Sequence, residues 1–143
     1  MPKPVLSDSL FNADDVATAV LAEANLQVAN SNLGVSDISS HFTLQSGWQT
    51  NAENFLFFNG FVFWCGYYYH GGGTPSDPET FITIDTSDYI PASTYVFPTS
   101  SYQGDTGSRV LVNTAGDISI QNPTNLSNST YYIAVNGFWN VNI

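Results

Sequence analysis

The chain has 143 residues, which is enough for one globular domain with an appended segment and too short for two independent folds. Two Lys and Arg residues against twelve Asp and Glu residues give a formal net charge of −10, which excludes binding to the phosphate backbone of nucleic acids and to anionic membrane surfaces. Only 10% of the residues are charged and 15% are aromatic, a composition typical of extracellular or virion β proteins.

The first predicted element is a helix over residues 13–30. Apolar residues between Leu10 and Ile38 recur at steps of three, four or seven, which are the a and d positions of a heptad seam. Gly34 is a stop signal, and the polar residues 36–40 after it are suited to a linker. We therefore expect a helical stem or docking segment over residues 1–36, with a lid packed on the rest of the chain as the alternative. The residues assigned to oligomerisation are Leu10, Ala17, Leu21, Ala24 and Val28.

Beyond this segment, runs rich in aromatic and β-branched residues alternate with turn residues. Asn59-Gly60 and Asn136-Gly137 each join two such runs and carry the strongest signal for a two-residue hairpin, while Ala115-Gly116 marks another turn. The pattern predicts an all-β domain over residues 37–143, an antiparallel β-sandwich or barrel of eight or nine short strands. The predicted strands cover residues 42–44, 54–58, 61–70, 80–84, 94–97, 108–113, 117–121, 130–135 and 138–141.

Alternation along these strands predicts which side chains face the interior. Tyr67-Tyr68-Tyr69 breaks the alternation, so at least one of these tyrosines must face outward or a subunit boundary. The single cysteine, Cys65, lies in an apolar run and is expected to be buried. The residues expected inside are Ile82, Ile84, Val110, Val112, Ile118 and Ile120.

No sequence pattern indicates catalysis or metal binding. The acidic residues mostly adjoin Ser, Thr, Gly or Pro, as solvated turn carboxylates do, and none is singled out as a pair for glycoside hydrolysis. His41 and His70 are far apart and lack second ligands nearby, and the sequence contains neither a nucleophile elbow nor a phosphate loop. We therefore predict a protein that is not an enzyme and that has no cofactor and no metal.

Ligand binding is the better supported hypothesis. Saccharides are recognised by aromatic faces together with Asn, Asp and backbone groups, in which this chain is rich. Such residues usually lie on loop tips, and the stretches 48–54, 70–77 and 102–105 are expected to be loops that combine aromatic and acidic groups. For Trp48 the alternative is a place in the core. The candidate ligand-binding residues are Trp48, His70, Asp77, Tyr102 and Asp105.

The order of motifs in the β region resembles a known family. Gly47-Trp48 is followed by the Asn59-Gly60 hairpin, by Ile-Pro-Ala-Ser before an aromatic-Pro pair (residues 90–98), and by Arg-Val-Leu-Val-Asn-Thr-Ala-Gly-Asp-Ile-Ser-Ile (residues 109–120). With the aromatic final strand, residues 43–143 are similar to the C-terminal head domain of bacteriophage tail-fibre and baseplate receptor-binding proteins, which are virion adhesins, especially those of phages of Gram-positive bacteria.

The resemblance implies a homotrimeric β domain on a short stem, displayed on a virion among other virion proteins and attaching without catalysis to host cell-wall or surface polysaccharide. It supplies no matched ligand-binding residues. The alternatives are a structural virion decoration protein without a ligand and a polysaccharide depolymerase. Because the sequence lacks a signal-peptide pattern and any apolar run of transmembrane length, we expect synthesis in the host cytoplasm, a virion location and no membrane partner.

Overall fold

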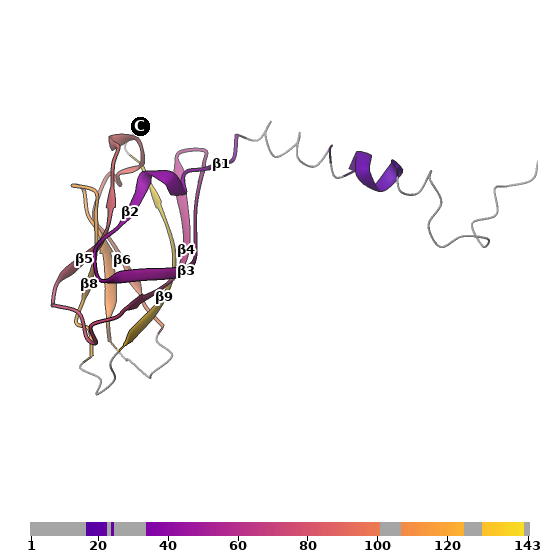
Figure 1. The fold of residues 1–143 in the computed structure, drawn as a ribbon. Coiled ribbons are helices and arrows are strands. Elements are labelled where there is room, and N and C mark those ends of the chain that lie inside the picture. The colour runs from indigo at the N-terminus through magenta and orange to yellow at the C-terminus, as the bar shows by residue number, and fades with distance from the viewer. Residues whose placement is uncertain (1–16, 23, 25–33, 101–106, 125–129, 142–143) are drawn as a thin grey trace, which may run out of the picture. The chain divides into compact units, whose positions relative to one another are not determined.

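The computed structural model describes residues 17–22, 24, 34–100, 107–124 and 130–141, and the chain divides into two units, Met1–Val35 and Ser36–Ile143 (Figure 1). In the first unit, residues 17–22 and 24 are helical with exposed side chains, within the range predicted for the helix. Leu10 and Val28, which complete the predicted seam, lie outside the described residues. In the described part of the chain, no helix is long and apolar enough to cross a membrane.

The second unit consists of two antiparallel sheets, which confirms the predicted sandwich (Figure 1). In spatial order, the four-stranded sheet contains β1 (Ser36–Asp37), β3 (Trp48–Phe58), β4 (Phe61–His70) and β9 (Tyr131–Asn140). The five-stranded sheet contains β2 (Phe42–Leu44), β5 (Glu79–Ile84), β8 (Asp117–Gln121), β7 (Arg109–Val112) and β6 (Tyr95–Pro98). Two short 3-10 helices, η2 (Ser39–His41) and η3 (Ser87–Tyr89), lie in the connections.

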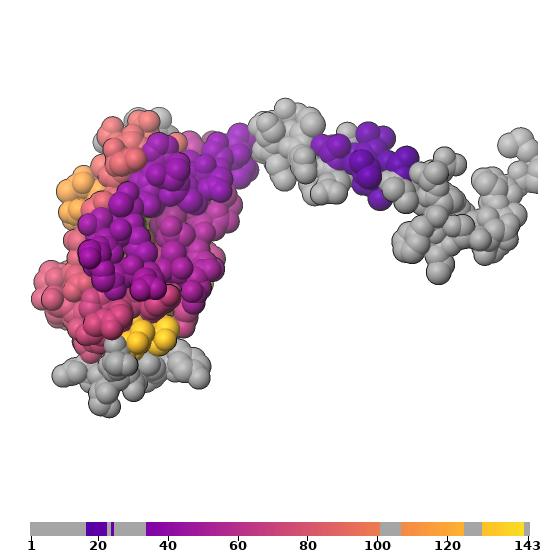
Figure 2. All heavy atoms as spheres, viewed as in Figure 1, coloured from indigo at the N-terminus to yellow at the C-terminus, as the bar shows by residue number. Residues whose placement is uncertain are grey.

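The inner faces of the two sheets form one core of aliphatic side chains and large rings. The six Ile and Val residues predicted for the interior are between 0% and 8% exposed, which confirms that prediction. Trp64 of β4 lies 5.5 Å from Phe55 and 6.3 Å from Trp139 between ring centroids. Phe42 of β2 stacks on Phe55 at 3.6 Å. The segment from η2 to β2, purple in Figure 2, therefore covers part of the core on the face turned toward the viewer.

Two of the predicted turns are confirmed. Asn59 and Gly60 join β3 to β4, and both have positive φ angles, 49° and 81°, as the two-residue type I′ hairpin requires. The turn from β7 to β8 is held by Asn113, whose Oδ1 accepts hydrogen bonds from the backbone N–H groups of Ala115 and Asp117 at 2.9 Å each. Local side-chain hydrogen bonds of this kind favour a turn over continued strand.

The third predicted turn, a hairpin at Asn136-Gly137, is wrong. β9 continues through both residues, and every residue of β4 pairs in register with one of β9. Gly137 is not among the glycines with positive φ, so its backbone does not need the freedom of glycine. A Cβ atom on Gly137 would instead lie 2.6 Å from the ring of Phe97. Glycine occupies this position because an aromatic ring packs directly against the backbone.

The predicted polar linker over residues 36–40 is also wrong. β1 pairs with β3, with Asp37 in register with Leu56. Ile38 is 2% exposed, and its backbone N–H donates to the carbonyl oxygen of Phe55 at 2.9 Å. Ile38 therefore belongs to the core of the sandwich and not to a helical seam. A segment with one apolar residue among polar ones resembles a linker in sequence. Strand β1 is too short to show an alternating pattern, so the sequence does not indicate that Ile38 is buried.

Candidate functional site

The outer face of the four-stranded sheet carries aromatic and amide side chains, and the outward positions of β3, β4 and β9 hold no charged residue. Alternation along these strands and the register between them arrange the side chains in cross-strand rows. In order along the sheet, the rows are Phe58, Phe61 and Asn140; Leu56, Phe63 and Phe138; Asn54, Cys65 and Asn136; Ala52, Tyr67 and Ala134; and Gln49, Tyr69 and Tyr132. We name the first two rows the phenylalanine half, the third row the amide row, and the last two rows the tyrosine half.

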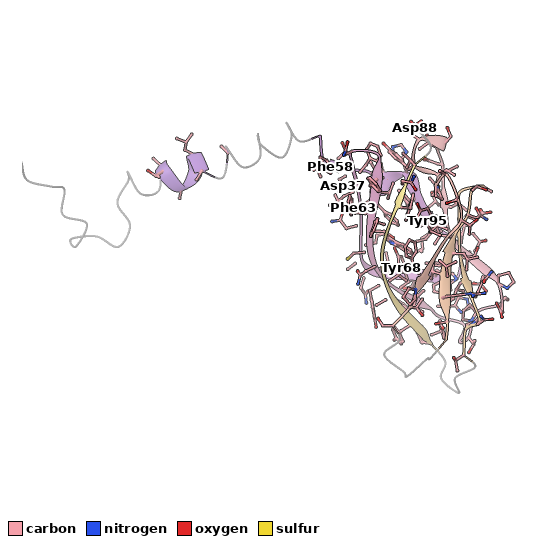
Figure 3. The ribbon with its side chains drawn as sticks, turned by 180° about the vertical axis from the view of Figure 1, so that it is seen from behind. Asp37, Phe58, Phe63, Tyr68, Asp88 and Tyr95 are labelled. Carbon is pink, nitrogen blue, oxygen red and sulfur yellow. The ribbon has the colours of Figure 1, made fainter. Side chains whose placement is uncertain are left out.

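The phenylalanine half is an exposed apolar surface. Phe61, Phe63 and Phe138 are 38%, 43% and 57% exposed, and their ring centroids lie 6.0 to 6.5 Å apart. Figure 3 shows Phe58 and Phe63 on one side of the sandwich, with the exposed carboxylate of Asp37 at the sheet edge nearby. Contiguous apolar groups at a surface mark a contact with another molecule.

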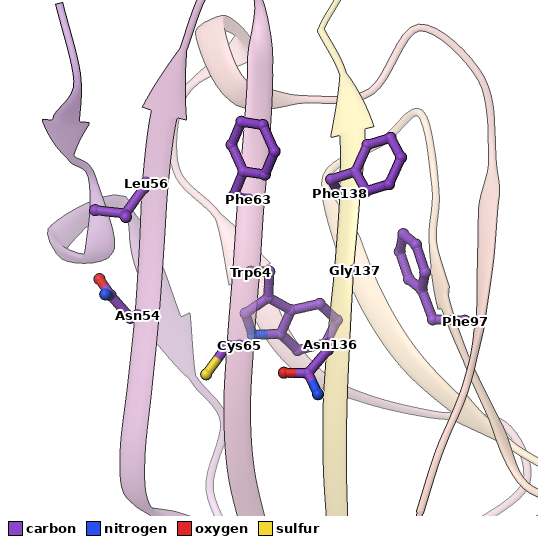
Figure 4. Close-up of a pocket in the computed structure, with 9 residues that line it drawn as sticks. All are labelled: Asn54, Leu56, Phe63, Trp64, Cys65, Phe97, Asn136, Gly137 and Phe138. Carbon is purple, nitrogen blue, oxygen red and sulfur yellow. The ribbon is translucent and has the colours of Figure 1, made fainter.

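A depression of about 480 Å³ extends from the phenylalanine half across the amide row (Figure 4). Cys65 lies there between the amides of Asn54 and Asn136, and it is exposed, so the prediction that it is buried is wrong. Its strand is apolar on both faces, because the inner positions of β4 build the core and the outer ones build the phenylalanine half. Apolar neighbours in the sequence therefore did not indicate burial at this position.

The tyrosine half combines rings with polar groups. Tyr67 and Tyr69 lie on the outer face while Tyr68 is buried, as the broken alternation predicted. Tyr132 packs against both outer rings, with centroids 6.0 Å from Tyr67 in a stacked arrangement and 5.8 Å from Tyr69. The hydroxyl of Tyr69 donates to Oε1 of Gln49 at 2.6 Å. Partly exposed rings with hydroxyl and amide groups at their edges are suited to contact with saccharides.

Trp48 and His70, two of the predicted ligand-binding residues, lie together where the tyrosine half ends. Residues 48–54 belong to β3, so the prediction of a loop there is wrong, and Trp48 is 5% exposed, which fits its alternative place in the core. Trp48 Nε1 donates to Glu79 Oε1 at 2.6 Å, and His70 Nε2 lies 3.6 Å from the same carboxylate oxygen. The Nδ1 atom of His70 is 2.8 Å from the carbonyl oxygen of Gly73. Glu79 thus holds both rings in position.

The other predicted ligand-binding residues are not brought into this cluster. Asp77 is exposed in the loop after β4, and its Oδ1 accepts a hydrogen bond from the backbone N–H of Asn122 at 3.0 Å. Tyr102 and Asp105 lie outside the described residues.

The outward residues of β9 and the amide row were not among the predicted ligand-binding residues. They lie on a strand face and not in loops, and the wrong prediction of a hairpin at residues 136–137 divided β9 into two strands. The available signal was the excess of apolar residues in β4, since a strand that is apolar on both faces needs a second contact in addition to the core.

Each of the two histidines contacts one carboxylate and one ring. His41 Nδ1 lies 2.8 Å from Asp85 Oδ1, with Tyr89 at 5.2 Å between centroids, and His70 lies 5.2 Å from Trp48. No group of three or more His, Cys, Asp and Glu side chains is placed to hold a metal ion within the described ranges. What this arrangement offers chemically is contact through rings, hydroxyls and amides.

A chain of polar contacts crosses the inner face of the four-stranded sheet. Trp64 Nε1 donates to the Tyr68 hydroxyl at 2.9 Å, and this hydroxyl donates to Glu53 Oε2 at 3.0 Å. Burial raises the pKa of the Glu53 carboxyl, and the hydrogen bond from Tyr68 opposes part of this rise. Burial, together with the nearby Glu53 charge, also raises the pKa of Tyr68. These two hydrogen bonds give the buried indole N–H of Trp64 and the hydroxyl of Tyr68 their partners.

Glu53→Gln is expected to raise the free energy of unfolding at neutral pH, by less than about 1 kcal/mol because the carboxyl is only half buried. Since the pKa of Glu53 is higher in the folded chain than in the unfolded chain, ionisation of this carboxyl destabilises the fold above the folded pKa. The destabilisation disappears as the pH falls through that pKa. Urea denaturation at about pH 7 and about pH 4 measures both values. An equal gain at the two pH values would contradict the assignment.

The described fold is a two-layer antiparallel β-sandwich. No protein-family model matches the sequence, and no curated protein is significantly similar to it. Among solved structures, the chain is similar in fold to the crystal structure of the receptor binding protein (gp15) of Listeria phage PSA, with a TM-score of 0.54 and 15% sequence identity. The match covers 99% of this chain and 82% of that chain. At this identity the likeness establishes a shared fold.

Proposed function

We propose that this protein is a bacteriophage virion adhesin, whose β-sandwich recognises host cell-surface saccharide without catalysis. The observation that carries the proposal is the fold likeness, over 99% of the chain, to a protein described as the receptor binding protein of a phage. The order of motifs over residues 43–143, which resembles receptor-binding heads of phages of Gram-positive bacteria, supports it independently.

The tyrosine half is the surface proposed to contact the saccharide. Tyr67, Tyr69 and Tyr132 offer ring faces for the C–H surfaces of sugars, and the Tyr69 and Gln49 pair offers polar atoms for sugar hydroxyls. The net charge of −10 disfavours a polyanionic receptor, so a neutral saccharide is proposed. His70, on the inner face of β4 beside Trp48, and Asp77, in the loop after β4, remain candidate contacts outside this surface.

The proposed assembly is a homotrimer that joins other virion proteins through residues 1–36, which act as a stem or docking segment. Three linked sites convert weak saccharide contacts into strong attachment to a polymer, because each later contact forms at a high effective concentration.

Tyr132→Ala is expected to weaken saccharide binding by about tenfold or more, because it removes the ring that packs against both neighbouring tyrosines. The measurement is binding of the full chain to an array of cell-wall polysaccharides from Gram-positive bacteria. Val96→Ala on the opposite sheet is the matched control and should bind like the wild type. Circular dichroism verifies that both variants are folded.

Two outcomes would replace the proposal. If no polysaccharide binds while the protein is incorporated into particles, a structural decoration role is supported instead. Release of reducing ends from a bound polysaccharide would indicate a depolymerase.

A further inference from the structure

We infer that the phenylalanine half and the amide row are covered by a second copy of this chain. The inference rests on the proposed function, since it names the surface through which the proposed oligomer forms. Phe61, Phe63 and Phe138 are 38%, 43% and 57% exposed and adjoin one another. Exposure of apolar surface to water is unfavourable, and contact with another apolar surface regains that free energy.

The distribution of charge favours a copy of the chain as the occupant. Two chains of net charge −10 repel each other in most orientations. The phenylalanine half and the amide row hold no charged side chain themselves, and the neighbouring carboxylate, Asp37, lies beside Leu56 on the edge strand β1 and is exposed. Two copies can therefore bring the rings and amides together without opposing like charges at the centre of the contact, while Asp37 stays in water at its rim. A basic partner would be drawn to the acidic surfaces elsewhere on the chain, because this face offers it no counter-charge.

The amide row can form hydrogen bonds to another copy of the chain. A side-chain amide both donates and accepts hydrogen bonds, so Asn54 and Asn136 can bond to polar groups of a neighbouring copy. Neither side chain makes a hydrogen bond to the parts of this chain that the structure describes, which leaves their full capacity for a partner. The depression of about 480 Å³ beside them has room for an aromatic side chain of the second copy. Apolar rings around a few amides are the usual composition at the centre of an interface.

The first unit carries a second apolar stripe that also fits a copy of the chain. Val20 and Leu21 are each 62% exposed within the helical residues 17–22. Ala17, Leu21 and Ala24 follow the spacing of a heptad seam, which pairs with a seam of the same kind. The helical unit by itself therefore also offers apolar residues to a copy of the chain.

The test compares the full chain with Phe138→Asp and with Val96→Asp as the matched control. Phe138 is 57% exposed on the four-stranded sheet and Val96 is 52% exposed on the five-stranded sheet, so each variant adds one charge at a strand position of similar exposure. Light scattering during size exclusion should give the wild type and Val96→Asp the mass of an oligomer, at least twice the 15.5 kDa of one chain. Phe138→Asp should give the mass of one copy. Phe63→Asp is the second interface variant, and far-UV circular dichroism verifies folding of all three.

Cys65 supplies an independent readout, because it is the only cysteine of the chain and lies in the amide row. It is exposed in one copy and would be covered in the assembly, so maleimide labelling should be at least about tenfold slower in the wild type than in Phe138→Asp. The same ratio is expected between Val96→Asp and Phe138→Asp.

Three results would overturn the inference: a wild type with the mass of one copy, an oligomer that persists in both interface variants, or fast labelling of Cys65 in the wild-type oligomer. Absence of saccharide binding in a protein that passes these tests would count against the proposed function alone. Persistence of the oligomer in the variants, with saccharide binding intact, would leave the proposed function standing and place the subunit contact elsewhere.

Discussion

Replacement of Trp139 by alanine is expected to lower the free energy of unfolding by about 3–5 kcal/mol, a large part of the roughly 5–15 kcal/mol that stabilises a typical domain. The Trp139 side chain is 0% exposed, and its ring lies 6.2 Å from Phe42, 6.3 Å from Trp64 and 6.4 Å from Phe97 between centroids. Alanine leaves a cavity that these large rings cannot fill without leaving their own contacts. The indole Nε1 also donates to the carbonyl oxygen of Tyr89 at 2.8 Å, which ties β9 to η3.

Urea denaturation at fixed protein concentration measures this loss as a lower midpoint with an unchanged slope. Trp139→Phe is the control, because it keeps an aromatic ring in the core and removes the hydrogen bond to Tyr89. We expect it to be the milder variant. A loss below about 1 kcal/mol for the alanine variant would show that the ring is not packed between the sheets.

The strands of the five-stranded sheet could be predicted because their two faces differ in polarity. Ile82 alternates with Thr83, and Ile118 alternates with Ser119, so the period of two directly indicates the inner face. The Asn59-Gly60 hairpin was predictable for a similar local reason, since both residues tolerate the positive φ angles that the turn requires.

The outer face of the four-stranded sheet was not predictable in this way, because β4 is apolar on both faces. The aromatic residues that build the core alternate with aromatic residues that lie at the surface, and only the register with β3 and β9 tells them apart. Trp48 and His70 were predicted as ligand contacts, but their meeting point, Glu79, is distant in sequence and only the fold brings it near. The candidate surface is therefore a product of strand pairing, and no short motif encodes it.

Gly137→Ala is expected to lower the free energy of unfolding by about 1–3 kcal/mol, because the added methyl group overpacks the core. The new Cβ would lie 2.6 Å from the Phe97 ring. That ring is held by Trp64 and Trp139, whose centroids lie 6.3 and 6.4 Å away, so it cannot move aside freely. Gly71→Ala is the matched control: a Cβ there meets nothing within 4 Å and the residue has no positive φ, so it should change stability by less than about 0.5 kcal/mol.

A double-mutant cycle with Phe97→Leu separates this explanation from the hairpin that the dipeptide Asn136-Gly137 resembles. If the ring of Phe97 is the obstacle, a smaller side chain makes room for the methyl group, and the double variant loses less stability than the sum of the two single variants. If Gly137 were required for a turn with positive φ, alanine would be strained whatever residue 97 is, and the two losses would add. Because β9 is the strand that carries Asn136 and Phe138, a non-additive cycle also supports the continuous strand on which the proposed interface depends.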